Sequence, residues 1–226
     1  MWLVGPHLVR CGPPDVLAAE VERHNWLAEH SPMPELAVAL DEWLVTVDVG
    51  HPVPRPELQP NPDEVPAVLG AAMAELHRLD PASCPFDGGW SSQLTIVEQA
   101  VEAKMLDAST LPDPYGRYRP DQLLAMIVES QPSDVDAVVC LGTPVASNLF
   151  LRGGVFCGAV GVNTLGIADR HRDLAVCHRS LLAHFGPEAL LGFYEGYGTD
   201  PDLVRLDHYI LIDVVLAAVA SESDES

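Results

Sequence analysis

The residues whose types and spacing could support chemistry are five cysteines, several histidines and one polar segment near residues 140–175. The cysteines form no CxxC pair, so they lack the spacing of a zinc site and are expected to be reduced thiols. His171 and His178 fall on one face of a predicted helix, but no acidic or thiol partner stands at a metal-binding spacing. No GxSxG sequence marks a nucleophilic serine. The sequence therefore predicts no metal site, and the informative part is the segment from Cys140 to Ala175.

This segment is predicted to form a short strand, a loop ending in Asn148, a hairpin around Gly153-Gly154 and the start of a helix. It resembles the catalytic core of the aminoglycoside 3'-phosphotransferase family, whose members read HGDxxxxN, then G-(F/Y)-I-D, then GRLGVADRxxDLA. The corresponding stretches here are LGTPVASN at 141–148, GAVG at 158–161 and NTLGIADRHRDLA at 163–175, and they align without a gap. The resemblance extends over nearly the whole chain. It implies an α+β, protein-kinase-like two-lobe fold.

The same alignment replaces the residues on which phosphoryl transfer depends, which are those at Leu141, Thr143, Gly161 and Arg10. In the family these positions hold the His and the catalytic Asp of HGD, the second metal-binding Asp and the lysine that grips the phosphates. Threonine cannot accept a proton as a carboxylate does, glycine offers no metal ligand, and arginine cannot present a compact ammonium. Only nine residues precede Arg10, so the family's glycine-rich hairpin is expected to be absent. We therefore expect neither phosphotransfer nor a bound cofactor.

Several neighbouring positions keep the family pattern. The resemblance gives Glu20, Arg170 and Asp173 structural roles: Glu20 is expected to pair with Arg10, and the other two to fix a helix start. The candidate ligand-binding residues are Asn148, Asp169, Arg179 and Asp213. Acids that bind amino sugars in the family are replaced by Ala183 and Val214, so aminoglycoside recognition by the family's own contacts is in doubt.

The elements that would position these residues divide at a proline-rich stretch. Residues 1–49 are predicted to form a truncated N-terminal lobe, a short sheet with one helix that Pro13-Pro14-Asp15 opens. Five prolines between Gly50 and Pro62 exclude a helix or a central strand there, so this stretch is predicted to be a connector. Residues 50–226 are predicted to form a mainly helical C-terminal lobe that carries the degenerate catalytic loop.

The charge of the chain narrows the classes of partner. Thirty-three acidic residues against twelve lysines and arginines give a formal net charge of −21, which disfavours nucleic acids and anionic membranes. Cationic small molecules or basic peptides or proteins suit this charge better, and the groove between the lobes is expected to be acidic. Neither a membrane span nor a signal peptide is evident, so a cytoplasmic location is expected. The sequence leaves the oligomeric state open.

Three functional hypotheses follow. The first is a pseudokinase of the aminoglycoside phosphotransferase type that binds a cationic ligand or partner without phosphorylating it. The second is a biosynthetic enzyme that uses the cleft for other chemistry on a peptide or small molecule, with Cys140, Thr143 or a histidine as the working group. The third is a divergent ATP-dependent phosphotransferase in which Asp134, Asp136 or Asp169 replaces the lost acids.

Overall fold

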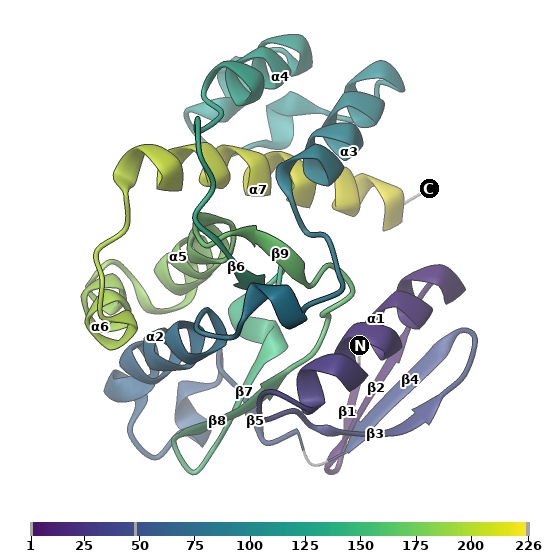
Figure 1. Cartoon of the computed structure of the whole chain (residues 1–226), viewed down its shortest axis with the longest axis vertical. Helices are drawn as coiled ribbons and strands as arrows, with labels where there is room; N and C mark the ends of the chain where they lie inside the picture. The colour runs from purple at the N-terminus through teal and green to yellow at the C-terminus, as the bar shows by residue number, and fades with distance from the viewer. Residues whose placement is uncertain (1, 48, 225–226) are drawn as a thin grey trace.

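A computed structural model describes residues 2–47 and 49–224 of the chain (Figure 1). Before the proline-rich connector, four antiparallel strands form a sheet in the order β1-β2-β4-β3. These strands are β1 (Trp2–Val4), β2 (His7–Cys11), β3 (Glu35–Ala39) and β4 (Trp43–Val47). Strands β3 and β4 pair antiparallel, and Glu35 lies opposite Val47. Helix α1 (Pro14–Ala28) begins at a proline, which suits a first turn because its missing N–H would be unpaired there.

The proline-rich stretch contains more local structure than its composition predicts. Residues His51–Pro52 form a short strand, β5, and two turns of 3-10 helix follow at Pro56–Leu58 and Pro62–Glu64. Strand β5 lies at the edge of a sheet with the order β5-β7-β8, where a proline without an N–H can be accommodated. Both 3-10 helices begin at a proline, whose fixed φ suits a helical first turn.

Helices dominate the remainder, as predicted, and strands interrupt them only around the motif segment. The helices are α2 (Val65–Leu76), α3 (Trp90–Glu102), α4 (Pro120–Glu129), α5 (His171–Phe185), α6 (Glu188–Tyr197) and α7 (Leu203–Asp224). The strands are β6 (Ala137–Cys140), β7 (Leu149–Arg152), β8 (Val155–Ala159) and β9 (Gly166–Asp169). Strands β7 and β8 are the predicted glycine hairpin, whereas β6 pairs antiparallel with β9.

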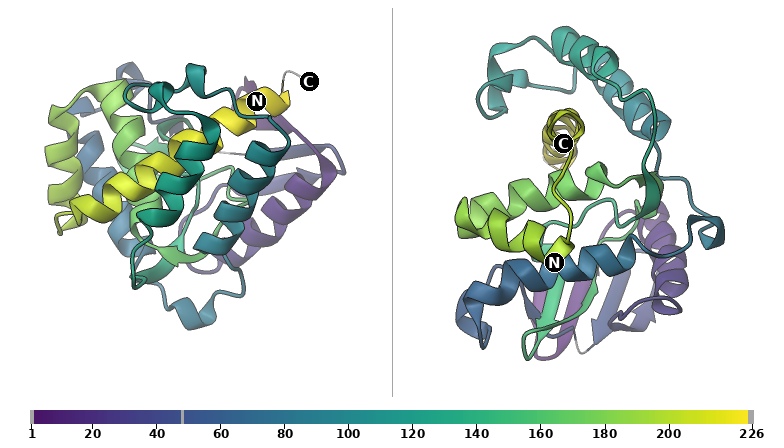
Figure 2. Two further views of the ribbon diagram at one scale, coloured as in Figure 1. Left: turned by 90° about the horizontal axis from the view of Figure 1, so that it is seen from above. Right: turned by 60° about the vertical axis from the view of Figure 1, so that its left-hand side comes forward.

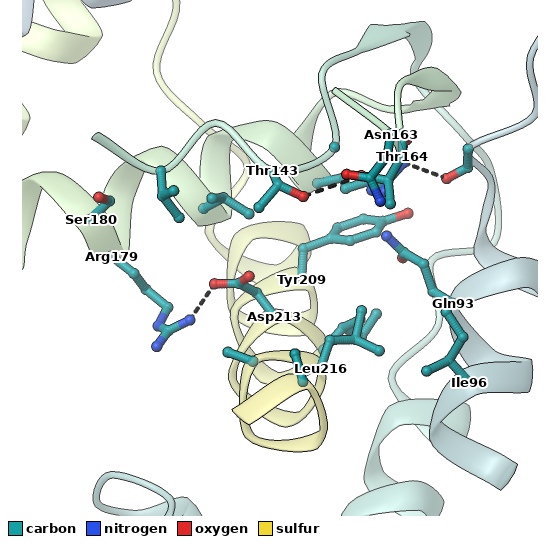
Figure 3. Close-up of a pocket in the computed structure, with 18 of the residues that line it drawn as sticks. Gln93, Ile96, Thr143, Asn163, Thr164, Arg179, Ser180, Tyr209, Asp213 and Leu216 are labelled. Atoms are coloured by element: carbon teal, nitrogen blue, oxygen red, sulfur yellow. Dashed lines mark hydrogen bonds and ion pairs between the residues drawn. The ribbon is translucent and has the colours of Figure 1, made fainter. Parts of the chain in front are cut away.

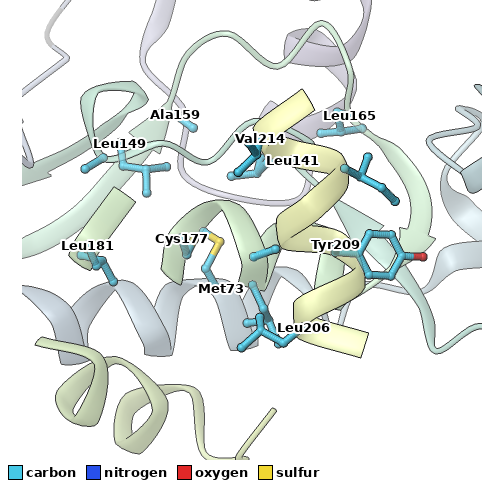
Figure 4. Close-up of a cluster of buried hydrophobic side chains, with 14 of the residues drawn as sticks. Met73, Leu141, Leu149, Ala159, Leu165, Cys177, Leu181, Leu206, Tyr209 and Val214 are labelled. Carbon is cyan, nitrogen blue, oxygen red and sulfur yellow. The ribbon is translucent and has the colours of Figure 1, made fainter. Parts of the chain in front are cut away.

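Helix α7 lies in the middle of the helical part, between α5 on one side and α3 and α4 on the other (Figure 2). The main core fills the space between α2, α5, α7 and the motif strands (Figure 4). Leu141, which occupies the position of the family's histidine, is buried in this core together with Leu165 and Val214. The buried Leu141 side chain therefore anchors the start of the catalytic loop in the main core.

Helices α2 and α6 approach each other very closely because glycine stands where they meet. A Cβ atom at Gly70 of α2 would lie 2.0 Å from the carbonyl oxygen of Phe193, and one at Gly196 of α6 would lie 2.0 Å from that of Ala67. No side chain fits at either position. Helix α6 in turn contacts α5, so this close pair lies next to the helix that carries several candidate residues.

Two further findings concern membrane-spanning helices and the cysteines. Among the described residues, no helix combines the length and the apolar character that a bilayer crossing requires. All five cysteines are free thiols.

Candidate functional site

The segment that aligns with the family's catalytic loop has a hydrogen-bonded backbone and carries Thr143 at the aligned acid position. It runs from the end of β6 to a 3-10 turn at Ala146–Asn148. The Asn148 amide donates from Nδ2 to the carbonyl oxygen of Thr143 at 3.2 Å, which closes the loop. The Thr143 hydroxyl lies 3.1 Å from that of Thr164, so it is engaged with a second hydroxyl and with no base. The position of the proton-accepting carboxylate is thus held by a neutral, hydrogen-bonded group.

Gly161 lies beside Asn148, as the alignment requires of a second metal-binding residue. Its φ of +69° is in the left-handed region, and a Cβ atom there would lie 2.8 Å from Asn148 Nδ2. The structure therefore brings together the two positions that would share a metal ion, but only one of them carries a ligand atom. The Gly161 backbone N–H donates to Glu20 Oε1 at 2.6 Å.

Glu20 joins three parts of the molecule. From α1 its buried carboxylate pairs with Arg10 on β2 and accepts the hydrogen bond from Gly161. Burial also lowers the pKa of the neighbouring His24, although the charge of Glu20 opposes that effect. The Arg10 guanidinium is mostly buried in this pair, which ties the N-terminal sheet to the motif segment.

The start of α5 carries carboxylates that hold backbone groups. Asp173 is fully buried and accepts hydrogen bonds from the N–H groups of Leu141 at 2.6 Å and Gly142 at 2.8 Å. Arg170 donates to the carboxylate of Asp136 at 2.9 Å and to the hydroxyl of Tyr197 at 3.2 Å. These contacts fix the catalytic loop against α5.

Asp169 is separated from the other residues predicted to bind a ligand. It is buried and accepts hydrogen bonds from His171, from Arg205 and from the backbone N–H of Asp136. Burial alone would raise the pKa of Asp169, but the hydrogen bonds from His171 and Asp136 outweigh it and hold the pKa at about 2. Asp169 therefore connects the start of α5 to α7 through His171 and Arg205. It does not line the cavity described below.

A buried trio of polar side chains lies under the loop and was not expected from the sequence. Ligand atoms of His77, Cys140 and Asp173 lie within 4.8 Å of one another. His77 bridges the hydroxyl of Tyr197 at 2.8 Å and the Asp173 carboxylate at 3.4 Å, and burial raises the pKa of the Cys140 thiol well above its usual value. His77 and Asp173 therefore support the loop through their hydrogen bond, and the Cys140 thiol donates to the backbone carbonyl oxygen of Asp169 at 3.4 Å.

A cavity of about 980 Å³ opens between the catalytic loop, α3, α5 and α7 (Figure 3). Arg179 of α5 and Asp213 of α7 meet there as an ion pair, so the structure brings together these two candidate ligand-binding residues. Burial raises the pKa of Asp213, while the charge of Arg179 opposes the shift. Thr143 also lines the cavity, whereas Asn148 lies next to its wall at Ser147. A cavity of this size is typical of a small-molecule site.

The lining of this cavity is not acidic, and of the N-terminal residues 1–49 it includes Arg23. Among the described residues that line the cavity, the acids are Asp87 and Asp213, and the arginines are Arg23, Arg172 and Arg179. The net charge of −21 is spread over the rest of the molecule. Sequence reasoning missed Arg172 and Gln93, because their place in the cavity depends on contacts between distant segments.

Comparisons with known proteins agree with this geometry. The model of the phosphotransferase enzyme family matches residues 7–209. An aminoglycoside 3'-phosphotransferase of Streptomyces fradiae is 32% identical over 213 residues, which cover 87% of this chain and 78% of that protein. One from Escherichia coli is 27% identical over 202 residues, covering 86% and 74%. The crystal structure of an aminoglycoside-3'-phosphotransferase of type VIII superposes with a TM-score of 0.81 at 30% identity, covering 92% of this chain and 84% of the other. The expected α+β, protein-kinase-like fold is confirmed.

Proposed function

Since the chain belongs to the phosphotransferase enzyme family, we propose that it is a member that binds a ligand in the cavity beside its catalytic loop without phosphorylating it. The observation that carries the proposal is the state of the two acid positions. Thr143 is hydrogen-bonded to Thr164, and Gly161 presents only its backbone N–H, which Glu20 occupies. Phosphoryl transfer needs a group to orient the attacking hydroxyl and ligands to hold Mg²⁺. One amide, Asn148, is left for both purposes, and Mg²⁺ requires several oxygen ligands.

The carboxylates that would have to substitute are engaged elsewhere. Asp134 pairs with Arg205, Asp136 pairs with Arg170, and Asp169 holds His171 and Arg205. None of these three acids lines the cavity. A divergent phosphotransferase that relies on them is therefore not supported.

Other chemistry in the cleft has no support from Cys140. Its thiol is buried, and burial holds its pKa well above the usual value, whereas a nucleophilic cysteine needs a lowered pKa and access. Thr143 has no neighbouring base among its hydrogen-bond partners in the described structure. A binding role is consequently preferred over a second enzymatic one.

The excess of acidic residues is relevant to peptide or protein partners. Because the cavity does not carry that excess, the preference for a basic peptide or protein applies to the outer surface of the chain. We propose in addition that a basic peptide or protein binds this outer surface. Salt should weaken that binding because it screens exposed charges.

The direct test is transfer of label from radioactive ATP to kanamycin in the presence of Mg²⁺, with an authentic aminoglycoside 3'-phosphotransferase as positive control. We expect no transfer above background. A thermal-shift experiment with ATP and Mg²⁺ runs in parallel: a ligand at 100 times its dissociation constant stabilises a protein by about 2.7 kcal/mol. Transfer by the unmodified chain that disappears in Asn148→Ala would refute the proposal.

A further inference from the structure

Arg172 is a buried cation without a carboxylate partner in the described part of the chain. It lies in the first turn of α5 with 8% of its surface exposed. Its Nη1 donates to two backbone carbonyl oxygens, that of Gly88 at 2.8 Å and that of Thr164 at 3.2 Å, while its Nε is buried without any partner. A buried charge is costly unless it is paired. Of the other two arginines of the cavity, Arg179 is paired with Asp213, whereas Arg23 is only half-buried and stacks on Phe86.

Two glycines make room for this guanidinium. A Cβ atom at Gly88 would lie 2.5 Å from Arg172 Nη1, and one at Gly142 would lie 2.7 Å from Arg172 Nη2. Gly142 directly precedes Thr143, so the charge lies beside the position where the family has its catalytic carboxylate. The loss of that carboxylate therefore leaves the guanidinium next to a neutral hydroxyl.

A second unsatisfied side chain lies at the same end of the cavity. Gln93 of α3 is 6% exposed, and its Oε1 has no hydrogen-bond partner. In Figure 3 its amide lies close to the ring of Tyr209 and below Asn163 and Thr164. The amide can turn to present either its oxygen or its NH₂ group to a ligand. Arg172 and Gln93 are thus two buried polar groups with free hydrogen-bonding capacity at one cavity wall.

Neither cavity acid forms an ion pair with Arg172 in the described structure, although burial raises the pKa of Asp213 and the charge of Arg172 helps to oppose that shift. Asp87 accepts a hydrogen bond from the backbone N–H of Gly89 at 2.9 Å, and Asp213 is held by Arg179. Between these polar groups the lining is apolar, with Ile96, Leu216 and Val219 among its members. A ligand that complements the cavity would therefore place an anionic group beside Arg172 and apolar atoms against α7.

We infer that Arg172 and Gln93 form the subsite for an anionic group, a carboxylate, of a ligand whose apolar body lies against α3 and α7. The inference rests on the proposed function, because it takes the ligand to be held unchanged in the cavity. A carboxylate gives the guanidinium the charged hydrogen-bond partner that the chain itself does not supply. A cationic guest would instead meet an unneutralised positive charge in a poorly solvated place.

The experiment compares three probes that share one apolar body: 4-phenylbutyrate, 4-phenylbutanol and 4-phenylbutylamine. Their binding to the full chain is measured by isothermal titration calorimetry at neutral pH without nucleotide. We expect the acid to bind about tenfold more tightly than the alcohol, because a hydrogen bond to a charged group contributes more than a neutral one, and the amine to bind most weakly. Equal binding of acid and alcohol, tighter binding of the amine, or no binding by any probe would overturn the inference.

Matched variants test whether Arg172 causes the preference for the acid. Arg172→Gln should abolish the preference for the acid, while Arg23→Gln, which removes the same charge from the same lining, should leave it. If circular dichroism shows that Arg172→Gln does not fold, Gln93→Leu serves instead and should weaken the acid several-fold while leaving the alcohol unchanged. A preference that survives Arg172→Gln, or survives Gln93→Leu where that variant is needed, contradicts the assignment.

The inference and the proposed function fail separately. Label transfer from ATP to an acceptor would refute the proposed function whatever the probes do. Loss of the preference for the acid in the absence of any transfer would refute only the anionic subsite.

Discussion

The catalytic loop and the start of α5 lie side by side and have had opposite fates. The loop carries Thr143 and Gly161 where the family resemblance places a carboxylate and a metal ligand, whereas Asp169 and Asp173 match the family pattern. The retained acids hold backbone N–H groups of other segments, namely those of Asp136, Leu141 and Gly142. No backbone group of the described chain depends on a side chain at Gly161, and the Thr143 hydroxyl contacts another hydroxyl. The acids that hold the fold together at the start of α5 are therefore different residues from those at the two aligned catalytic positions.

Removing a retained acid should have the largest effect on stability. Asp173→Ala leaves two buried N–H groups without an acceptor and takes a partner from His77, so we expect a loss of about 4 kcal/mol in the free energy of unfolding. Thr143→Ala in the adjoining loop should cost less than about 1 kcal/mol. Urea denaturation of both variants measures the difference. Equal losses would erase the distinction between the two regions.

The second prediction concerns the pH dependence of stability and helix α7, which Asp169 contacts through Arg205. Burial lowers the pKa of His208 on α7 to about 4, from an ordinary value of 6.5. Its neutral form is therefore favoured in the native state, so stability is fully present above pH 6.5 and falls as the pH drops from 6.5 to 4, by up to about 3 kcal/mol.

Asp169, whose pKa is about 2, contributes stability that is present above about pH 4 and is lost only as the pH falls toward 2. The fall in the free energy of unfolding between pH 7 and pH 4 should thus be smaller in His208→Asn than in the unmodified chain, and the remainder should include the contributions of His24 and His178, whose pKa values burial also lowers. A wild-type protein equally stable at pH 7 and pH 4.5 would contradict the assignment.

The link between the N-terminal sheet and the motif segment gives a third, smaller effect. Glu20→Gln removes the charge that Arg10 and the Gly161 N–H share, and we expect a loss of about 2 kcal/mol. Glu75→Gln is the matched control, because the Arg78–Glu75 pair is exposed and such pairs contribute about 0–1 kcal/mol. Chemical denaturation compares the two. A cost for Glu20→Gln no greater than that of the control would show that the buried pair does not fasten the lobes.

The sequence predicted the fold far better than it predicted the cavity. Local signals such as the glycine hairpin at 153–154 and the proline at the start of α1 depend on neighbours in the chain, and the structure contains both elements. The charge of the cleft depends on which distant side chains meet, and composition does not contain that information. Arg172 became significant only through Gly88, which lies 84 residues away. The sequence places Asp169 among the candidate ligand-binding residues, whereas the structure pairs it with Arg205 of α7, a contact that no local pattern predicts.

Rebuilding the lost acids should have the smallest effect, namely no gain of phosphotransfer. In Thr143→Asp the introduced carboxylate would lie near the guanidinium of Arg172, whose Nη2 is 2.7 Å from a Cβ atom built at Gly142. That charge would lower the pKa of the carboxylate and make it a poor general base. In the double variant with Gly161→Asp the second carboxylate would face Asn148 and complete part of a metal site, yet Arg10 remains bound to Glu20 where a lysine should grip the phosphates.

We expect no transfer of label from radioactive ATP to kanamycin by the double variant. The unmodified chain and an active family enzyme are the controls. Adding Arg172→Gln to the double variant removes the competing charge, so turnover that appears only in this triple variant would show that Arg172 had been the obstacle. Turnover in Thr143→Asp alone would mean that a single carboxylate separates the two regions, and that the rest of the phosphotransfer site is intact.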